Sequence, residues 1–409
     1  MQNLLANLNQ EYIEIQEKGL KLDMTRGKPS SEQLALSEEL LQIKETKAAD
    51  GTDCRNYGGL EGIPEARAMF GEYLGASPEE VLVGGNSSLA LMHDIFVQEL
   101  FRGRDGNSWS KTEAPCFLCP VPGYDRHFTI CELYGIKMLP IPMHEDGPDI
   151  SFTQQMALNP SVVGIWCVPK YSNPTGATYS AEVVRKLASM PTGNPGFRIF
   201  WDNAYAVHDL KEESDFLLNI LDECKKHGTE DRVYMFGSTS KITFAGAGIS
   251  AVAMSEANLK WFCKGYQGQT IGPDKLNQRR HALFLQSLKN IQEHMGRHRE
   301  ILKPKFVAVN EELSKRFSGD TLVARWTKPN GGYFIDLKVE DDCATRVVEL
   351  AKVAGVKLTP AGATFPYGID PHDNDIRIAP SFPRVEEVRQ AMNVVGLCIQ
   401  IASAEKAEQ

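Results

Sequence analysis

Short apolar runs recur through the middle of the chain and alternate with longer stretches of mixed polarity. The runs that have the length and residue types of buried strands lie at residues 81–83, 116–119, 137–141, 162–168, 198–201, 232–236 and 249–254. Segments of helix length separate several of them, at residues 87–100, 124–134 and 180–190. Strands that alternate with helices form mostly parallel sheets covered on both faces. The pattern therefore predicts an α/β fold with a mostly parallel sheet of about seven strands flanked by helices.

The regions on either side of this alternation have a different pattern. The first 50 residues contain two helix-like stretches. The C-terminal region contains a long helical stretch, two strand-like runs and a closing helix, at residues 275–317, 331–336, 375–379 and 385–402. We expect a large domain and a smaller α+β domain formed by both termini. We expect residues 1–50 to form an N-terminal segment that contributes to the small domain. Residues 51–290 would form the large domain, and residues 291–409 the C-terminal small domain.

Composition and charge exclude several classes of protein. With 42% hydrophobic and 24% charged residues, the chain has the composition of an ordinary globular protein. Its net charge of -9 argues against a nucleic-acid partner, which usually requires a basic face. No apolar run is long enough to span a membrane, and the first residues lack the pattern of a signal peptide. We expect a cytoplasmic protein without a membrane partner.

Cysteine and histidine spacing predicts neither a disulfide framework nor a metal site. The nine cysteines are odd in number and scattered along the chain. Cys116 and Cys119 form one CxxC pair, but no second pair follows at a spacing that suits zinc. A redox pair is the alternative, but the pair lies in an apolar, strand-like run, and we expect both to be buried side chains of a strand.

Glycine, amide and hydroxyl residues follow the first predicted strand, in the segment Gly84-Gly-Asn-Ser-Ser88. This segment opens a predicted helix, and the free amides at a helix N-terminus favour a phosphate. Asn and Ser are equally common as plain helix caps. The segment by itself leaves both interpretations open.

Three further polar residues follow later strands. Asp202 ends an apolar strand, and a carboxylate in that position needs a positive partner, either a protonated heteroaromatic nitrogen or an arginine. Tyr205 comes three residues later, where its phenol can reach the same ligand. Asn173 precedes a proline, which favours an extended backbone.

Lys241 follows another strand and has no acidic residue within the segment 234–248. Burial without a carboxylate disfavours the ammonium form and leaves a reactive amine. Taken alone, the residue is more often interpreted as a loop lysine that points into water. Because ligands of open α/β sheets bind at the carboxyl ends of strands, we expect these groups to lie together. A phosphate cradle, an acid, a phenol, an amide and a lysine together suit pyridoxal 5'-phosphate.

The blocks that carry a family resemblance are Asn173-Pro-Thr-Gly176, Asp202-x-x-Tyr205, Ser238-x-Ser-Lys241 and the segment around Arg377. Their order and spacing resemble those of fold-type I, class I pyridoxal-phosphate aminotransferases along nearly the whole chain. Residues 237–248 are most similar to a divergent branch that includes aspartate aminotransferases.

The resemblance implies roles for the residues that would bind the cofactor. Lys241 would form the Schiff base and later carry protons, while Asp202 would pair with the ring nitrogen. Tyr205 and Asn173 would bind the phenolic oxygen, and Tyr124 would stack on the ring. The phosphate would be held by Gly85, Asn86, Ser87 and Ser238.

The resemblance also implies a shared site between two subunits. Tyr57 matches a tyrosine that reaches the phosphate of the neighbouring subunit, which implies a homodimer. His127 matches a histidine behind the aspartate, although a plain core histidine is an equal alternative.

Arg377 matches the arginine that binds the substrate α-carboxylate, with Asn173 and the backbone of Gly27 beside it. A bidentate contact of this kind suits arginine better than lysine. A distal carboxylate would need another cation, and the candidates are Arg26, Lys28, Lys275 and Arg279.

One position departs from the family pattern. Members of the class usually carry a phosphate-binding arginine eight residues after the lysine, and this chain has Ile249 there. Lys275 or Arg279 are candidates to supply the missing charge.

The resemblance implies ping-pong transfer of an amino group between an amino acid, aspartate or glutamate, and a 2-oxo acid. The alternatives with the same cofactor are a lyase or decarboxylase, and an aminotransferase for aromatic or aminoadipate-type substrates. A transcription regulator with an aminotransferase-like sensor domain would need a basic winged-helix segment, and the acidic helical N-terminal stretch does not resemble one.

Overall fold

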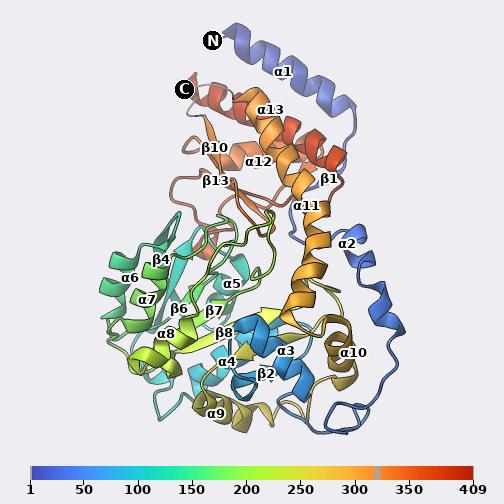
Figure 1. The fold of residues 1–409 in the computed structure, drawn as a ribbon. Coiled ribbons are helices and arrows are strands. Elements are labelled where there is room, and N and C mark those ends of the chain that lie inside the picture. Colours follow the sequence, from blue (N-terminus) through green and yellow to red (C-terminus); the bar gives the residue numbers. More distant parts are fainter. Residues whose placement is uncertain (1, 318–322, 409) are drawn as a thin grey trace.

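The computed structural model describes residues 2–317 and 323–408. Its largest element is a mixed, mostly parallel sheet of eight strands in the order β2-β9-β8-β7-β6-β3-β4-β5 (Figure 1). The strands are β2 Val81–Val83, β3 Cys116–Val121, β4 Lys137–His144, β5 Gly147–Pro148, β6 Val162–Cys167, β7 Arg198–Asp202, β8 Val233–Ser238 and β9 Ser250–Ala253. Strands β4, β3, β6, β7 and β8 are parallel, whereas β9 and β5 are antiparallel to their neighbours.

The seven strands expected in the large sheet are all present, and the structure adds one to that sheet. Strand β5 has two residues and pairs with the end of β4 at the sheet edge. A pair such as Gly147 and Pro148 carries no apolar run, so the hydrophobic pattern could not predict it. The fold class is the one that the alternation of strands and helices indicates.

Helices cover both faces of this sheet because its central strands are apolar on both sides. Strand β7 places Phe200 on one face and Trp201 on the other, and neither is more than 1% exposed. One face packs against α4 Ser88–Phe101, α5 Asp125–Leu133 and α9 Glu256–Tyr266. The other packs against α3 Pro64–Leu74, α6 Ile150–Ala157, α7 Ala181–Ser189 and α8 Ile220–His227. The sheet edge formed by the strand ends stays available for the site.

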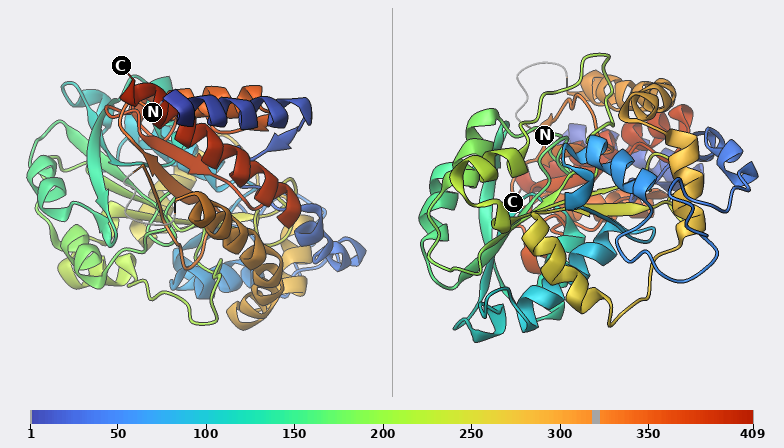
Figure 2. Two further views of the ribbon diagram at one scale, coloured as in Figure 1. Left: turned by 90° about the horizontal axis from the view of Figure 1, so that it is seen from above. Right: turned by 60° about the horizontal axis from the view of Figure 1, so that its bottom comes forward.

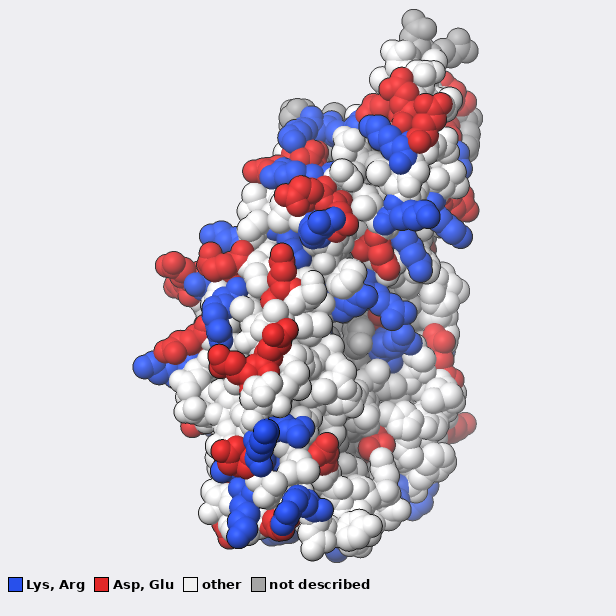
Figure 3. Space-filling model, turned by 90° about the vertical axis from the view of Figure 1, so that its right-hand side faces the viewer, with Lys and Arg blue, Asp and Glu red and all other residues white. Residues whose placement is uncertain are grey.

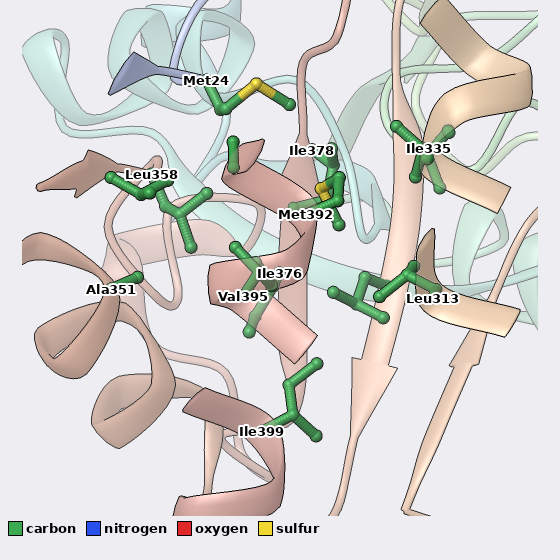
Figure 4. Packing of buried hydrophobic residues seen from close by; sticks show 14 of the residues in the cluster. Met24, Leu313, Ile335, Ala351, Leu358, Ile376, Ile378, Met392, Val395 and Ile399 are labelled. Carbon is green, nitrogen blue, oxygen red and sulfur yellow. The ribbon is translucent and has the colours of Figure 1, made fainter. Parts of the chain in front are cut away.

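A smaller antiparallel sheet lies beyond this region, with the strand order β10-β11-β13. Its strands are β10 Ala324–Trp326, β11 Ile335–Val339 and β13 Asp375–Ile378. They pack against α11 Leu288–Arg316, α12 Ala344–Val353 and α13 Val385–Ala407 in one apolar cluster. Figure 4 shows side chains from helices and strands meeting in this cluster, among them Leu313, Ile376 and Val395.

Both termini contribute to this second region, as the sequence predicts. Helix α1 Gln2–Glu17 packs against α13, and Figures 1 and 2 show the two helices side by side. Strand β1 Leu22–Asp23 pairs in parallel with β12 Val356–Lys357. The exact boundaries at residues 50 and 290 stay a prediction.

The helical stretches differ from expectation in two places. The predicted stretch over residues 275–317 is two helices, α10 Lys275–Leu285 and α11, separated at Gln286, whose φ is 60°. The second N-terminal helix is a short α2 Ser31–Ala35 followed by a 3₁₀ turn, Glu38–Gln42. Helix α11 has 29 residues and runs from the large sheet to the small one (Figure 1).

The surface carries both signs of charge. In the face drawn in Figure 3, acidic and basic side chains are interspersed, and no broad basic band crosses it. Among the described residues, no helix is long and apolar enough to cross a membrane.

Candidate active site

A cavity of about 1090 Å³ lies between the carboxyl edge of the large sheet and the small sheet. The predicted site residues in its wall are Gly27, Tyr124, Asn173, Asp202, Tyr205, Lys241 and Arg377. Ser88 and Leu89, at the start of α4, also line it. Residues spread over most of the chain therefore meet at one cavity, as the positions after the strands indicate.

Asp202, the last residue of β7, is 4% exposed and only partly satisfied. Its Oδ2 lies 3.1 Å from Nε2 of His127, while its Oδ1 is buried and has no hydrogen-bond partner among the described residues. The His127 ring stacks on Trp166 with centroids 4.3 Å apart, which holds the imidazole behind the carboxylate. A buried carboxylate oxygen without a donor is unfavourable. This end of the cavity therefore suits a ligand that brings a proton donor.

Lys241 lies just after β8, with its amine 5.0 Å from the centroid of the Tyr205 ring. Burial lowers the pKa of Lys241, and the attraction of Asp202 opposes this shift only in part. Burial likewise raises the pKa of Tyr205 and of Tyr124, which keeps both phenols protonated near neutral pH. The amine can therefore lose its proton more easily than an exposed lysine.

The backbone of Lys241 is held by a buried network that the sequence did not reveal. Tyr333 donates its hydroxyl to the Lys241 carbonyl over 3.4 Å, and Gln33 of α2 donates to the Tyr333 oxygen over 2.9 Å. On the next residue, Nε2 of His294 lies 2.9 Å from the Ile242 carbonyl oxygen. These partners come from segments far apart in sequence, so no local motif could predict them.

Arg377 of β13 comes to the cavity from the small sheet and is 8% exposed. Its Nη1 donates to Oδ1 of Asp125 over 2.9 Å and to Oδ1 of Asn173 over 3.4 Å. The guanidinium carbon lies 5.0 Å from the centroid of the Phe334 ring. A Cβ on Gly27 would come within 2.4 Å of that ring, so only glycine fits there.

Asp125 and Phe334 are two functional candidates that the sequence analysis missed. Asp125 follows Tyr124, and Phe334 lies in the strand-like run over residues 331–336. Their contacts with Arg377 join segments that are more than 40 residues apart in the chain. The only local signal was the position of Asp125 directly after Tyr124.

The predicted phosphate loop joins β2 to α4. Ser87 caps α4, because its Oγ accepts from the backbone N–H of Ala90 over 3.3 Å. The Asn86 carbonyl accepts from Oγ of Ser240 over 2.9 Å, which links this loop to the loop of Lys241. A Cβ on Gly85 would meet nothing within 4 Å, so there is open space beside its backbone. Ser238 ends β8 opposite Ser250.

The candidates for the missing positive charge do not line the cavity of their own chain. Ile249 is 1% exposed and belongs to the core beneath the sheet. Lys275 donates from Nζ to the Gly58 carbonyl over 2.6 Å, and Nη1 of Arg279 pairs with Oε1 of Glu65 over 2.7 Å. Tyr57, beside Gly58, is 82% exposed. Lys275 thus anchors the loop that presents Tyr57 to the outside.

Comparison with known proteins decides the family. The whole chain, residues 1–409, matches the family described as aspartate amino-transferase. The chain belongs to the aspartate aminotransferase family. An aspartate aminotransferase of Corynebacterium glutamicum is 45% identical over 405 residues, which cover 98% of this chain and 93% of the relative.

Solved structures agree with this family membership. The crystal structure of an aspartate transaminase from C. glutamicum matches with a TM-score of 0.96 and covers 98% of this chain and 96% of its own. The fold also matches that of an α-aminoadipate aminotransferase from Thermus thermophilus, which was solved with N-(5'-phosphopyridoxyl)-L-leucine. The TM-score is 0.75 at 22% identity, and the match covers 96% of this chain and 95% of that chain. The predicted aminotransferase activity is therefore confirmed, and the chain is an aspartate aminotransferase-like transaminase.

Proposed function

We propose that this aminotransferase uses pyridoxal 5'-phosphate to move an amino group between aspartate or glutamate and a 2-oxo acid. The observation that supports the proposal is that Asp202 and Lys241 line the same cavity. Asp202 has a buried oxygen without a donor, and the Lys241 amine has a lowered pKa. The first suits a protonated ring nitrogen and the second suits covalent attachment of an aldehyde.

The residues present fit this cofactor at the ring nitrogen and the phenolic oxygen, while the phosphate would depend on backbone amides and hydroxyls in place of the missing arginine. Asp202 would hold the proton of the ring nitrogen, and His127 would keep the carboxylate in place from behind. Tyr205 and Asn173 would bind the phenolic oxygen, and Tyr124 would cover one face of the ring. The phosphate would lie at the N-terminus of α4, held by Gly85, Asn86, Ser87 and Ser238.

When bound, pyridoxal phosphate supplies an electron sink that stabilises negative charge at the substrate α-carbon. Arg377 binds the α-carboxylate and orients the Cα–H bond toward Lys241. Lys241 then takes the α-proton on Nζ and later returns a proton, which its lowered pKa favours near neutral pH. The first 2-oxo acid leaves before the second binds, so we expect ping-pong kinetics.

The preference for a second carboxylate is part of the proposal. Of the cations considered from the sequence, Arg26 and Lys28 line the cavity. Nζ of Lys28 lies 3.8 Å from the centroid of the Phe382 ring. We propose Arg26 and Lys28 as the partners of a distal carboxylate.

We also propose a homodimer with shared sites. Tyr57 is a large side chain that is 82% exposed on a loop anchored by Lys275. An exposed aromatic on an anchored loop suits contact with a second copy. Sedimentation analysis, and reduced cofactor affinity in Tyr57→Ala, would support this arrangement.

The test is a screen of amino donors with 2-oxoglutarate and oxaloacetate as acceptors. We expect aspartate and glutamate to be strongly preferred and product analysis to find no net loss of ammonia or CO₂. Preference for aromatic or branched donors would overturn the substrate class, and ammonia or CO₂ release would favour a lyase or decarboxylase.

A further inference from the structure

Arg377 already has a carboxylate partner from its own chain. Its Nη1 donates to Oδ1 of Asp125 over 2.9 Å, and Asp125 itself lines the cavity. We propose that Asp125 is a placeholder carboxylate, which holds Arg377 when the site is empty and is displaced by the α-carboxylate of the substrate. This inference rests on the proposed role of Arg377 as the carboxylate-binding residue.

The geometry of the guanidinium determines that the two carboxylates compete. A carboxylate binds arginine most strongly through two parallel N–H bonds, along one edge of the guanidinium. The edge that includes Nε is covered in this conformation, because Nε is buried, and a ligand can reach it only if the covering atoms move. The remaining edge is formed by Nη1 and Nη2, and Asp125 is bound to Nη1. A substrate that binds both N–H groups of this uncovered edge must therefore take the donor that Asp125 uses.

Asp125 is the partner that can move. Its side chain is 32% exposed, whereas that of Arg377 is 8% exposed and lies over the Phe334 ring. Asp125 is the first residue of α5, where the helix N-terminus stabilises a carboxylate even without an arginine. If the Asp125 side chain leaves Arg377 by a rotamer change, its carboxylate therefore stays in a favourable environment. Arg377, by contrast, would be left as an unpaired buried cation if it had no partner.

If Asp125 holds Arg377, it raises the stability of the fold and lowers the affinity for carboxylate ligands. In the empty site, Asp125 stabilises the fold because it neutralises a buried guanidinium. In the binding equilibrium, Asp125 weakens every carboxylate ligand, since each must first replace it. Removal of its charge should lower stability and raise ligand affinity together, which a plain structural residue would not do.

The experiment measures succinate binding by calorimetry to the cofactor-loaded enzyme. Succinate has carboxylates but neither an amino nor an oxo group, so its binding involves no reaction. We expect Asp125→Asn to bind succinate about tenfold more tightly than the natural chain, the effect of one charge-assisted hydrogen bond. The KM for aspartate should fall in parallel, while the unliganded protein should melt at a lower temperature. Unchanged or weaker succinate binding would overturn the proposal.

A matched control separates competition from general electrostatics. Asp23 also lines the cavity but hydrogen-bonds to Thr25 rather than to Arg377. Asp23→Asn removes the same charge from the cavity wall, and we expect it to change succinate affinity less than about twofold. If Asp23→Asn tightens binding as much as Asp125→Asn does, competition at Arg377 is wrong. Asp125→Ser provides a second uncharged variant should the asparagine protein not fold.

Arg377→Ala distinguishes this inference from the proposed function. If succinate binding to Arg377→Ala is as tight as to the natural chain, Arg377 does not bind substrate carboxylates and the proposed role fails. If Arg377→Ala abolishes binding and Asp125→Asn leaves it unchanged, the role of Arg377 stands and the placeholder is refuted.

Discussion

The large sheet and the small sheet bring charged groups to the cavity in different states. At the sheet end, where strands β7 and β8 finish, Asp202 keeps one oxygen without a donor and Lys241 keeps an amine whose pKa is lowered by burial. Arg377 comes from the small sheet, and its guanidinium is bound to Asp125. Asp202 and Lys241 can therefore gain a partner from a ligand, whereas Arg377 must exchange one partner for another.

The difference follows from the way each end is built. Asp202 and Lys241 follow neighbouring parallel strands, so the sheet fixes both. Arg377, Asp125 and Gly27 come from three separate parts of the chain that meet only after the small sheet packs against the large one. We infer that the sheet end suits a resident cofactor and that the Arg377–Asp125 pair suits a substrate that binds and leaves in each cycle.

Loss of the lysine should produce the largest effect, at the sheet end. In Lys241→Ala, both covalent attachment and proton transfer disappear, and proton transfer alone is worth about 10²–10⁴-fold in rate. We expect no measurable transamination in steady-state assays. Substantial residual turnover would contradict the assignment of Lys241.

The next effect tests whether Asp202 serves the cofactor. Asp202→Asn keeps the shape but removes the negative charge beside the proposed position of the ring nitrogen, and we expect kcat to fall about 10²–10³-fold, as for loss of one preorganised electrostatic group. The variant should still fold, since His127 can hydrogen-bond to the amide. A kcat within about twofold of the natural enzyme would show that the free oxygen has no part in the reaction.

On the side of the small sheet, Arg377→Lys should act mainly on substrate affinity. A lysine cannot make the bidentate contact, and loss of one strong hydrogen bond corresponds to about a tenfold increase in KM. The measurement is KM and kcat for aspartate. A fall in kcat without a change in KM would place Arg377 in the chemistry rather than in binding.

The smallest effect concerns stability and its pH dependence without cofactor. Burial lowers the pKa of Lys241 in the folded protein, so the charged amine destabilises the fold most below that folded pKa. This penalty shrinks as pH rises through the window up to the ordinary pKa of 10.5 and then vanishes. Lys241→Met should therefore raise the Tm of the apoprotein by about 1–2 °C at neutral pH.

Thermal melts of both proteins between pH 7 and alkaline pH provide the check. The difference in Tm should narrow as pH increases. A difference that is constant with pH would mean that packing of the methionine, and not the charge of the lysine, accounts for it.

The large sheet could be predicted from the sequence because its strands are short, apolar and regularly spaced. The same regularity placed Asp202, Asn173 and Lys241 together, since the carboxyl ends of parallel strands share one edge. Strand β5 could not be predicted from two residues without an apolar run, and the break at Gln286 carries no proline or glycine to announce it.

The sequence by itself determined the alternation of strands and helices and, through it, the group of polar residues after the strand ends. These depend on local periodicity and on the geometry of a parallel sheet, both of which one chain segment can express. Only the tertiary structure decided that Asp125 holds Arg377, that Phe334 excludes any side chain at Gly27, and that Ile249 points into the core. Such contacts join residues tens to hundreds of positions apart, where packing of whole layers, rather than any local pattern, sets which side chains meet.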